Sequence, residues 1–138
     1  MGQISNEEAN QWCFACGRNN PIGLKLSFRE ENDTYISHFT AGPEHQSYDG
    51  IVHGGIISTL LDEITTRYLY ARGWNAVTAR LEIRYRHPTP IGKELTIIGR
   101  LKGHKGHMYE MAGEIRLPDG TVTAQAKAIV AVIGEEKS

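Results

Sequence analysis

Apolar side chains recur at helical spacing in one long stretch of the chain, between residues 52 and 73. Arg72 followed by Gly73 suits the end of a helix. Two glycines, Gly54 and Gly55, open the stretch where Ser or Asp would be the usual cap, so backbone N–H groups are left accessible to a ligand. The pattern predicts one long helix whose buried stripe has i, i+3, i+4, i+7 spacing: Ile57, Leu60, Leu61, Ile64 and Tyr68.

The opposite face of this helix carries small residues around one carboxylate. Its members are Gly55, Ser58, Thr59, Asp62 and Thr66. Small side chains suit close approach by another backbone, such as a partner helix. Asp62 has no basic residue three or four positions later, whereas Glu63 can pair with Arg67 on the same helix. We therefore expect Asp62 to have a catalytic role and Glu63 to have a structural one.

Apolar and polar residues alternate in six further segments, which predicts half-buried strands. These segments are 24–28, 35–39, 79–86, 95–101, 109–117 and 122–132. Two strands, a helix and four strands predict an α+β domain with one helix on an antiparallel sheet. We expect a single domain over 1–138 with a loose lead-in over 1–12. The second face of the helix has no partner within such a domain, which favours a dimer.

Composition narrows the function classes. The chain has 138 residues and a net charge of -1, so no overall field favours nucleic acid or an anionic membrane surface. No apolar run is long enough to span a bilayer. Residues 1–11 lack the basic start and the apolar stretch of a signal peptide. The expected location is cytoplasmic, with neither nucleic acid nor membrane as a partner.

The only two cysteines are Cys13 and Cys16. They precede a turn rather than opening a helix, and no second Cys pair or close His pair accompanies them. A structural turn, a metal shared with a His or a partner chain, and a redox pair all remain open. No other residues show metal-ligand spacing, so no metal is expected at the active site. The absence of a Gly-x-Ser-x-Gly segment counts against a serine hydrolase, and no glycine-rich phosphate loop is present.

The tripeptide His53-Gly54-Gly55 is followed by an acid, Asp62, eight residues after Gly54. This pattern resembles the PaaI-type (HGG) branch of the hotdog-fold acyl-CoA thioesterases. The resemblance covers about residues 13–133 and indicates the fold and branch but not the acyl group. It includes Cys16-Gly17, Asn20-Pro21-Ile22-Gly23-Leu24, His45-Gln46, Leu60-Leu61-Asp62, Thr78-Ala79-Arg80-Leu81, Pro88-Thr89-Pro90 and Gly92.

The resemblance implies a hotdog fold, in which a curved antiparallel sheet wraps one long helix, and two protomers joined through their sheets. The glycine amides would bind the thioester carbonyl, and the helix acid would act as general base or nucleophile. A strand Thr would assist the acid, and a polar loop residue would position carbonyl or water. These roles point to Gly54, Gly55, Asp62 and Thr78, with Gln46 and Ser47 as alternatives in the loop. We expect His53 to orient the loop.

Physical distance adds a constraint. A thioester hydrolase needs donors aimed at an oxyanion and a base or nucleophile. At about 1.5 Å per residue, Asp62 lies about 12 Å from Gly54 along the helix axis, whereas catalytic contact needs about 3 Å. We therefore expect composite sites in a homodimer or homotetramer, each built from two antiparallel helices.

The predicted substrate is an acyl-CoA thioester, and no separate cofactor is expected. Candidates for binding the phosphates of coenzyme A are Arg80, Arg84, Lys102, His104 and Lys105. The alternative function is a non-catalytic module that binds or senses acyl-CoA, although pure binding does not need an acid facing the thioester. A hotdog hydratase would carry an Asp–His or His–Glu pair in a different motif, which this sequence lacks.

Overall fold

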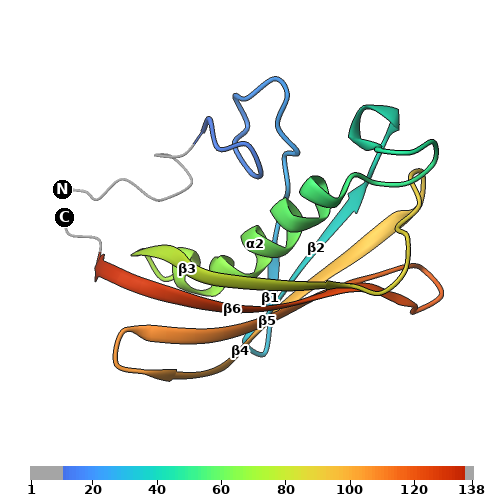
Figure 1. The fold of residues 1–138 in the computed structure, drawn as a ribbon. Helices are drawn as coiled ribbons and strands as arrows, with labels where there is room; N and C mark the ends of the chain where they lie inside the picture. The colour runs from blue at the N-terminus through green and yellow to red at the C-terminus, as the bar shows by residue number, and fades with distance from the viewer. Residues whose placement is uncertain (1–10, 136–138) are drawn as a thin grey trace.

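The computed structural model describes residues 11–135, so most of the expected lead-in, residues 1–10, lies outside the described residues. One long helix and six strands make up the fold, together with one short 3-10 helix (Figure 1). In chain order they are β1 (Arg29–Glu31), β2 (Thr34–Thr40), η1 (Pro43–His45), α2 (Gly54–Ala71), β3 (Trp74–Tyr85), β4 (Glu94–Lys105), β5 (Met108–Arg116) and β6 (Val122–Glu135).

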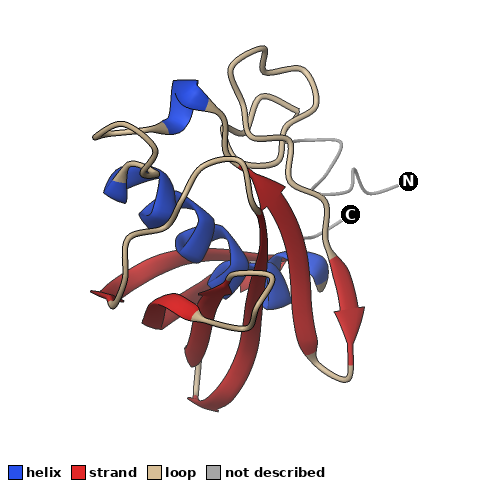
Figure 2. Cartoon of the chain, turned by 90° about the vertical axis from the view of Figure 1, so that its right-hand side faces the viewer, coloured by secondary structure: helices blue, strands red, loops and turns tan. Residues whose placement is uncertain are grey.

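All neighbouring strands pair antiparallel in the order β1-β2-β4-β5-β6-β3. The long strand β3 therefore forms one edge of the sheet, and the three-residue β1 forms the other. Helix α2 lies across one face of the twisted sheet (Figures 1 and 2) and packs against β2, β3, β4, β5 and β6. This arrangement confirms the predicted α+β hotdog architecture. Within residues 11–135, no helix is long and apolar enough to cross a membrane.

The predicted apolar stripe of α2 faces the sheet. Ile57, Leu60, Leu61 and Ile64 are almost fully buried, as the helical spacing requires. Helix and sheet approach closely because Gly99 on β4 has no side chain, and a Cβ there would overlap the carbonyl oxygen of Ile64. The close packing fixes which residues of α2 remain on its other, more open side.

The predicted strand over 24–28 is wrong. Leu24 and Leu26 are buried as the alternation suggested, but Lys25 between them has φ 54° and the segment joins no strand. Instead, the N–H of Leu24 donates to the Phe14 carbonyl at 2.8 Å, and the N–H of Leu26 donates to the Ala15 carbonyl at 2.9 Å. A loop that anchors alternate residues in the core gives the same sequence pattern as a strand.

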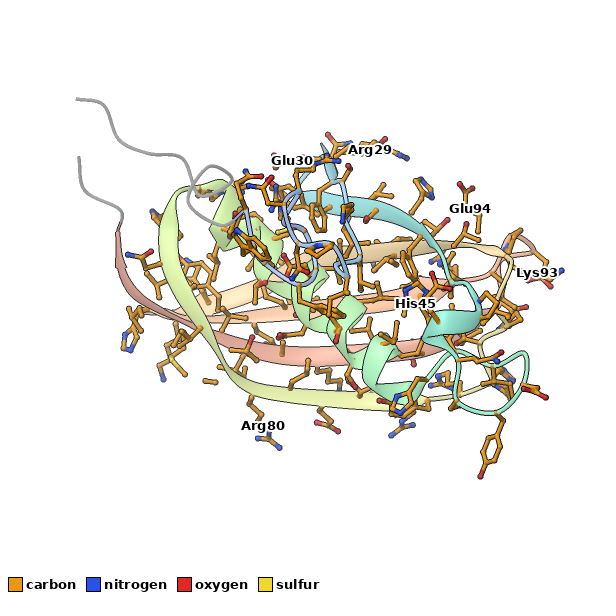
Figure 3. The ribbon with its side chains drawn as sticks, turned by 90° about the horizontal axis from the view of Figure 1, so that it is seen from above. Arg29, Glu30, His45, Arg80, Lys93 and Glu94 are labelled. Atoms are coloured by element: carbon orange, nitrogen blue, oxygen red, sulfur yellow. The ribbon has the colours of Figure 1, made fainter. Side chains whose placement is uncertain are left out.

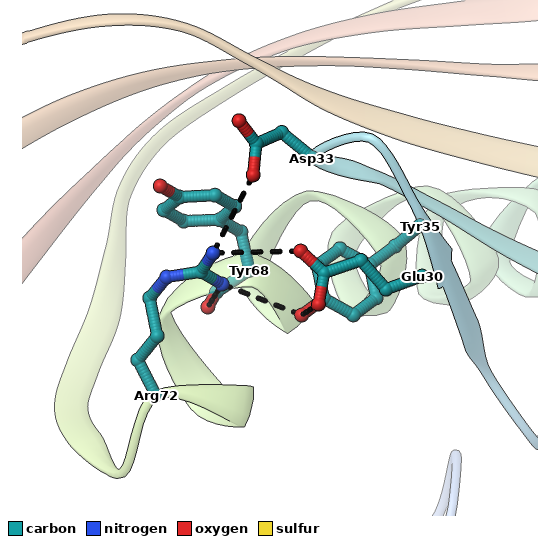
Figure 4. Close-up of polar contacts among 5 residues, drawn as sticks. All are labelled: Glu30, Asp33, Tyr35, Tyr68 and Arg72. Atoms are coloured by element: carbon teal, nitrogen blue, oxygen red, sulfur yellow. Dashed lines mark hydrogen bonds and ion pairs between the residues drawn. The ribbon is translucent and has the colours of Figure 1, made fainter.

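A charged cluster ties the end of α2 to the β1–β2 hairpin (Figure 4). The Arg72 guanidinium forms ion pairs with Glu30 at 3.4 Å and Asp33 at 3.6 Å, and it lies 3.5 Å from the ring centre of Tyr68. It also donates to the Tyr35 hydroxyl at 3.3 Å. Burial, followed by the hydrogen bond to Glu30, raises the pKa of Tyr35. The cluster holds the far end of the helix against the sheet.

Candidate active site

The start of α2 is capped by its own motif. His53 occupies the N-cap, and its Nδ1 accepts a hydrogen bond from the Gly55 N–H at 2.8 Å. This contact differs from the expectation that both glycine amides are unpaired, while the role of His53 in orienting the loop stays a prediction. The Gly54 N–H has no hydrogen-bond acceptor within residues 11–135. One unpaired amide at a helix N-terminus thus remains available to a ligand.

The acid in the middle of α2 is held by strand β3. Thr78 donates its hydroxyl proton to Asp62 Oδ1 at 2.7 Å. The structure therefore brings together the two residues that the resemblance paired. The second carboxylate oxygen, Oδ2, has no hydrogen bond to any part of the chain that the structure describes. The carboxylate is fixed through one oxygen while the other is available for chemistry.

An open pocket of about 300 Å³ lies beside this pair. It runs between the small-residue face of α2 and the beginning of β3, and its walls combine polar and aromatic side chains. The lining residues are Asp62, Thr66, Tyr70, Trp74, Ala76, Val77 and Thr78. The arrangement can present a carboxylate to the polar end of a substrate whose apolar part lies against the rings.

Tyr85, to which the sequence assigned no polar role, lies at the helix start. Its hydroxyl shares a hydrogen bond of 2.8 Å with Ser58 Oγ and donates to the Gly54 carbonyl at 3.1 Å. Tyr85 ends the alternating pattern of β3, and only the packing of β3 beside α2 places it there. These bonds join the first turn of the helix to the same edge strand that supplies Thr78.

The loop before α2 is fastened by its own polar groups. Gln46 Oε1 accepts from the Gly50 N–H at 3.0 Å, and the His53 N–H donates to the His45 carbonyl at 2.8 Å. The Ser47 side chain is exposed, and its hydroxyl makes no hydrogen bond to residues 11–135. Gln46 thus shapes the loop in this structure, while Ser47 remains accessible.

The five candidate cations do not gather at one place. Arg80 projects outward from the edge strand β3 (Figure 3), and His104 stacks on Tyr109 with ring centres 4.6 Å apart. Lys105 ends β4 beside the turn to β5. Arg84 and Lys102, however, line a groove of about 340 Å³ together with Arg86 and Lys127. Leu81 and Ile83 face the core, so the alternating Glu82 and Arg84 place this groove on the outer face of the sheet.

Glu63 interacts with the charge of Arg67, as the sequence suggested, but it also has neighbours that the sequence did not predict. Its carboxylate lies beside the thiols of Cys13 and Cys16, and the three ligand atoms are all within 4.8 Å of one another. Burial raises the pKa of Glu63, while Cys16 and Arg67 oppose that shift; burial followed by the charge of Glu63 raises the pKa of Cys16. The expectation that no residues gather with metal-ligand spacing therefore needs correction.

A model of the Thioesterase superfamily matches residues 49–124, which include the glycine motif, Asp62 and Thr78. The chain belongs to the Thioesterase superfamily. The match extends over more than half of the chain, from the loop before α2 into β6.

Individual relatives agree with this family. The chain is 29% identical over 103 residues to the acyl-coenzyme A thioesterase THEM4 of Mus musculus, covering 74% of this chain and 44% of that protein. The chain spans about half the length of the curated relatives it matches.

Solved structures show the same fold. A crystal structure of a thioesterase superfamily protein superposes with a TM-score of 0.83 at 26% identity, over 95% of this chain and 66% of that one. The protein smu.793 from Streptococcus mutans, solved with acetyl CoA bound, gives a TM-score of 0.74 at 25% identity, over 81% of this chain and 91% of that one.

Proposed function

We propose that this protein hydrolyses an acyl-CoA thioester to the free acid and coenzyme A, as a member of the HGG branch of its superfamily. The observation that carries the proposal is the bond of 2.7 Å from Thr78 to Asp62 at the wall of an open pocket. The mouse relative is named an acyl-coenzyme A thioesterase, and the Streptococcus mutans protein binds acetyl CoA. Both support a thioester of coenzyme A as the substrate.

Asp62 supplies the chemistry of this proposal. Thr78 fixes Oδ1, so the lone pairs of Oδ2 can accept a proton from water or attack the thioester carbonyl directly. The thiolate of coenzyme A then leaves. In the general-base route the oxygen of water enters the product acid, whereas in the covalent route water hydrolyses an acyl–Asp62 anhydride and its oxygen enters either the product acid or the Asp62 carboxylate. Hydrolysis in ¹⁸O-water distinguishes the routes, because a covalent route can leave ¹⁸O in the peptide that contains Asp62.

A second copy of the chain would complete the site. Gly54 cannot reach the carbonyl that Asp62 of its own chain attacks, because about 12 Å of helix separates them. The edge strand β3 has an unpaired side in the single chain, with Val77 49% exposed, and such edges readily pair. Pairing two β3 strands would lay the helices antiparallel and bring the Gly54 N–H of one copy to Asp62 of the other, where the helix dipole stabilises an oxyanion.

The remaining candidate site residues are proposed to have supporting roles. In this proposal Gln46 keeps the loop in shape, Ser47 reaches the thioester, and His53 orients the glycine turn. Arg84 and Lys102 are proposed to bind phosphates of coenzyme A, because they share a groove with Arg86 and Lys127. Tyr70 and Trp74 would pack against the acyl group.

The test is release of free thiol from a panel of acyl-CoA thioesters. We expect Asp62→Asn to lower kcat at least about 100-fold, the usual contribution of a general base, with KM changed less than about threefold. Glu94→Gln, an exposed acid at the start of β4, is the matched control and should keep full activity. Wild-type protein that binds acyl-CoA but releases no thiol would instead be a binding module, and an active Asp62→Asn variant would refute the assigned role.

Mixing two inactive variants tests the composite site. In a dimer of Asp62→Asn with Gly54→Val, one site would carry both changes and the other neither. Random subunit exchange should therefore restore about a quarter of wild-type activity for a two-fold symmetric dimer. If each site lies within one chain, exchange restores nothing, and the dimer model fails while the hydrolase assignment stands.

A further inference from the structure

Two thiols and a carboxylate converge away from the thioester pocket. The sulfur atoms of Cys13 and Cys16 and a carboxylate oxygen of Glu63 all lie within 4.8 Å of one another. The three side chains are partly buried between the N-terminal turn and the middle of α2. Glu63 adjoins Asp62 in sequence, but it points to another side of the helix.

The backbone holds this turn in position. The Gly17 N–H donates to the Cys13 carbonyl at 2.8 Å, and the Asn19 N–H donates to the Gln11 carbonyl at 2.8 Å. A Cβ at Gly17 would overlap the Cys13 backbone nitrogen, so the turn closes only with glycine there. Ala15, between the cysteines, is 3% exposed and anchors the turn in the core. The thiols are thus placed beside the helix by the fold itself.

The spacing and ligand types fit zinc. Zinc–sulfur bonds of about 2.3 Å in a tetrahedral site place two sulfur ligands about 3.8 Å apart, which the limit of 4.8 Å allows after a small adjustment. Thiolates select zinc over magnesium and calcium, which prefer oxygen ligands. Three protein ligands leave one position for water, and a hollow of about 310 Å³ lined by Cys16 gives solvent access.

The charges also balance. Two thiolates and one carboxylate would place three negative charges in a partly buried cluster, which is unfavourable without a cation. Arg67, 8% exposed and one helical turn after Glu63, stabilises the carboxylate anion. A divalent cation together with this guanidinium neutralises the set.

We propose that Cys13, Cys16 and Glu63 bind one zinc ion, which fastens the N-terminal turn to α2. The site does not depend on the proposed hydrolase function, because none of its ligands takes part in that chemistry. Zinc bound here adds a cross-link between the N-terminal turn and α2.

Cobalt(II) titration tests the site directly. The whole chain, purified without a histidine tag, is reduced, treated with chelator and titrated with Co²⁺ alone. We expect one equivalent to produce the near-ultraviolet sulfur-to-cobalt charge-transfer band, and Zn²⁺ to displace it. Because the sequence contains only two cysteines, such a band reports this pair. No band in fully reduced protein, or purified protein whose two cysteines form a disulfide, would overturn the proposal.

Variants separate the ligands from their surroundings. Glu63→Gln should weaken Co²⁺ binding by more than about 10-fold. Loss of an outer-shell partner usually costs at least this much, and a direct ligand should cost more. Asp62→Asn, the matched loss of a neighbouring carboxylate, should bind Co²⁺ like wild type. Zinc should raise the Tm of wild type but not of Cys16→Ser. Equal Co²⁺ binding by wild type and Glu63→Gln would remove Glu63 from the site, and this readout holds even if Cys16→Ser does not fold.

Discussion

Replacing Thr78 by Val removes one hydroxyl from the candidate active site and keeps the shape of the side chain. The hydroxyl donates to Asp62 Oδ1 at 2.7 Å. A hydrogen bond to a charged group contributes about 1.5–3 kcal/mol, which corresponds to about 10- to 150-fold in kcat/KM if it is lost in the transition state. Thr78 is only half-buried, so water can replace the hydroxyl, and we expect a loss of about 10- to 30-fold.

The assay is thiol release at low acyl-CoA concentration, which reports kcat/KM. Thr78→Ser keeps the donor and should recover most of the activity. Thr66→Val is the matched control, because Thr66 lines the same pocket but donates only to backbone carbonyls of its own helix. It should change kcat/KM less than about threefold. A folded Thr78→Val variant with wild-type kcat/KM would show that the bond does not position Asp62 for chemistry.

Three further perturbations test other parts of the structure. A Cβ at Gly54 would lie 3.7 Å from the Tyr85 hydroxyl, so Gly54→Ala should fold. Its methyl group should block the substrate carbonyl and lower kcat/KM at least about tenfold. Full activity would refute the close approach of the carbonyl to Gly54. Arg72→Met removes partly exposed ion pairs and a cation–π contact and should lower the free energy of unfolding by about 1 kcal/mol, as measured in urea. Because the pKa of Tyr35 is raised in the folded state, its contribution to stability is complete below about pH 10 and is lost as pH rises through the folded pKa. Urea unfolding at several pH values in this range should show that the free energy of unfolding falls less steeply with pH in Tyr35→Phe than in wild type. Parallel pH curves for the two proteins would contradict the raised pKa of Tyr35.

The local spacing of apolar residues predicted the long helix and most of the strands. The stripe from Ile57 to Ile64 predicted α2, because a surface helix buries its apolar face whichever element packs against it. The same reasoning failed over 24–28, because Leu24 and Leu26 are buried by a loop that bonds to the N-terminal turn. Periodicity reports burial and cannot distinguish strand pairing from other backbone contacts.

In the candidate site too, the sequence predicted some features and missed others. Asp62 stood out because no basic residue lies one turn later to pair with it. Its contact with Thr78 was expected only from the resemblance, and the observed bond depends on β3 lying beside α2. For Glu63, the local pairing with Arg67 hid a contact with Cys13 and Cys16, which come from a distant segment of the chain.

The sequence by itself determined the helix, most of the strands, the α+β class and the unusual glycine start of α2, because these follow from spacing and backbone preference within a few residues. Only the tertiary structure decided that Thr78 holds Asp62 and that Glu63 meets the cysteine pair. Such contacts depend on how elements pack and on side-chain directions to within about an ångström, and no single segment encodes either.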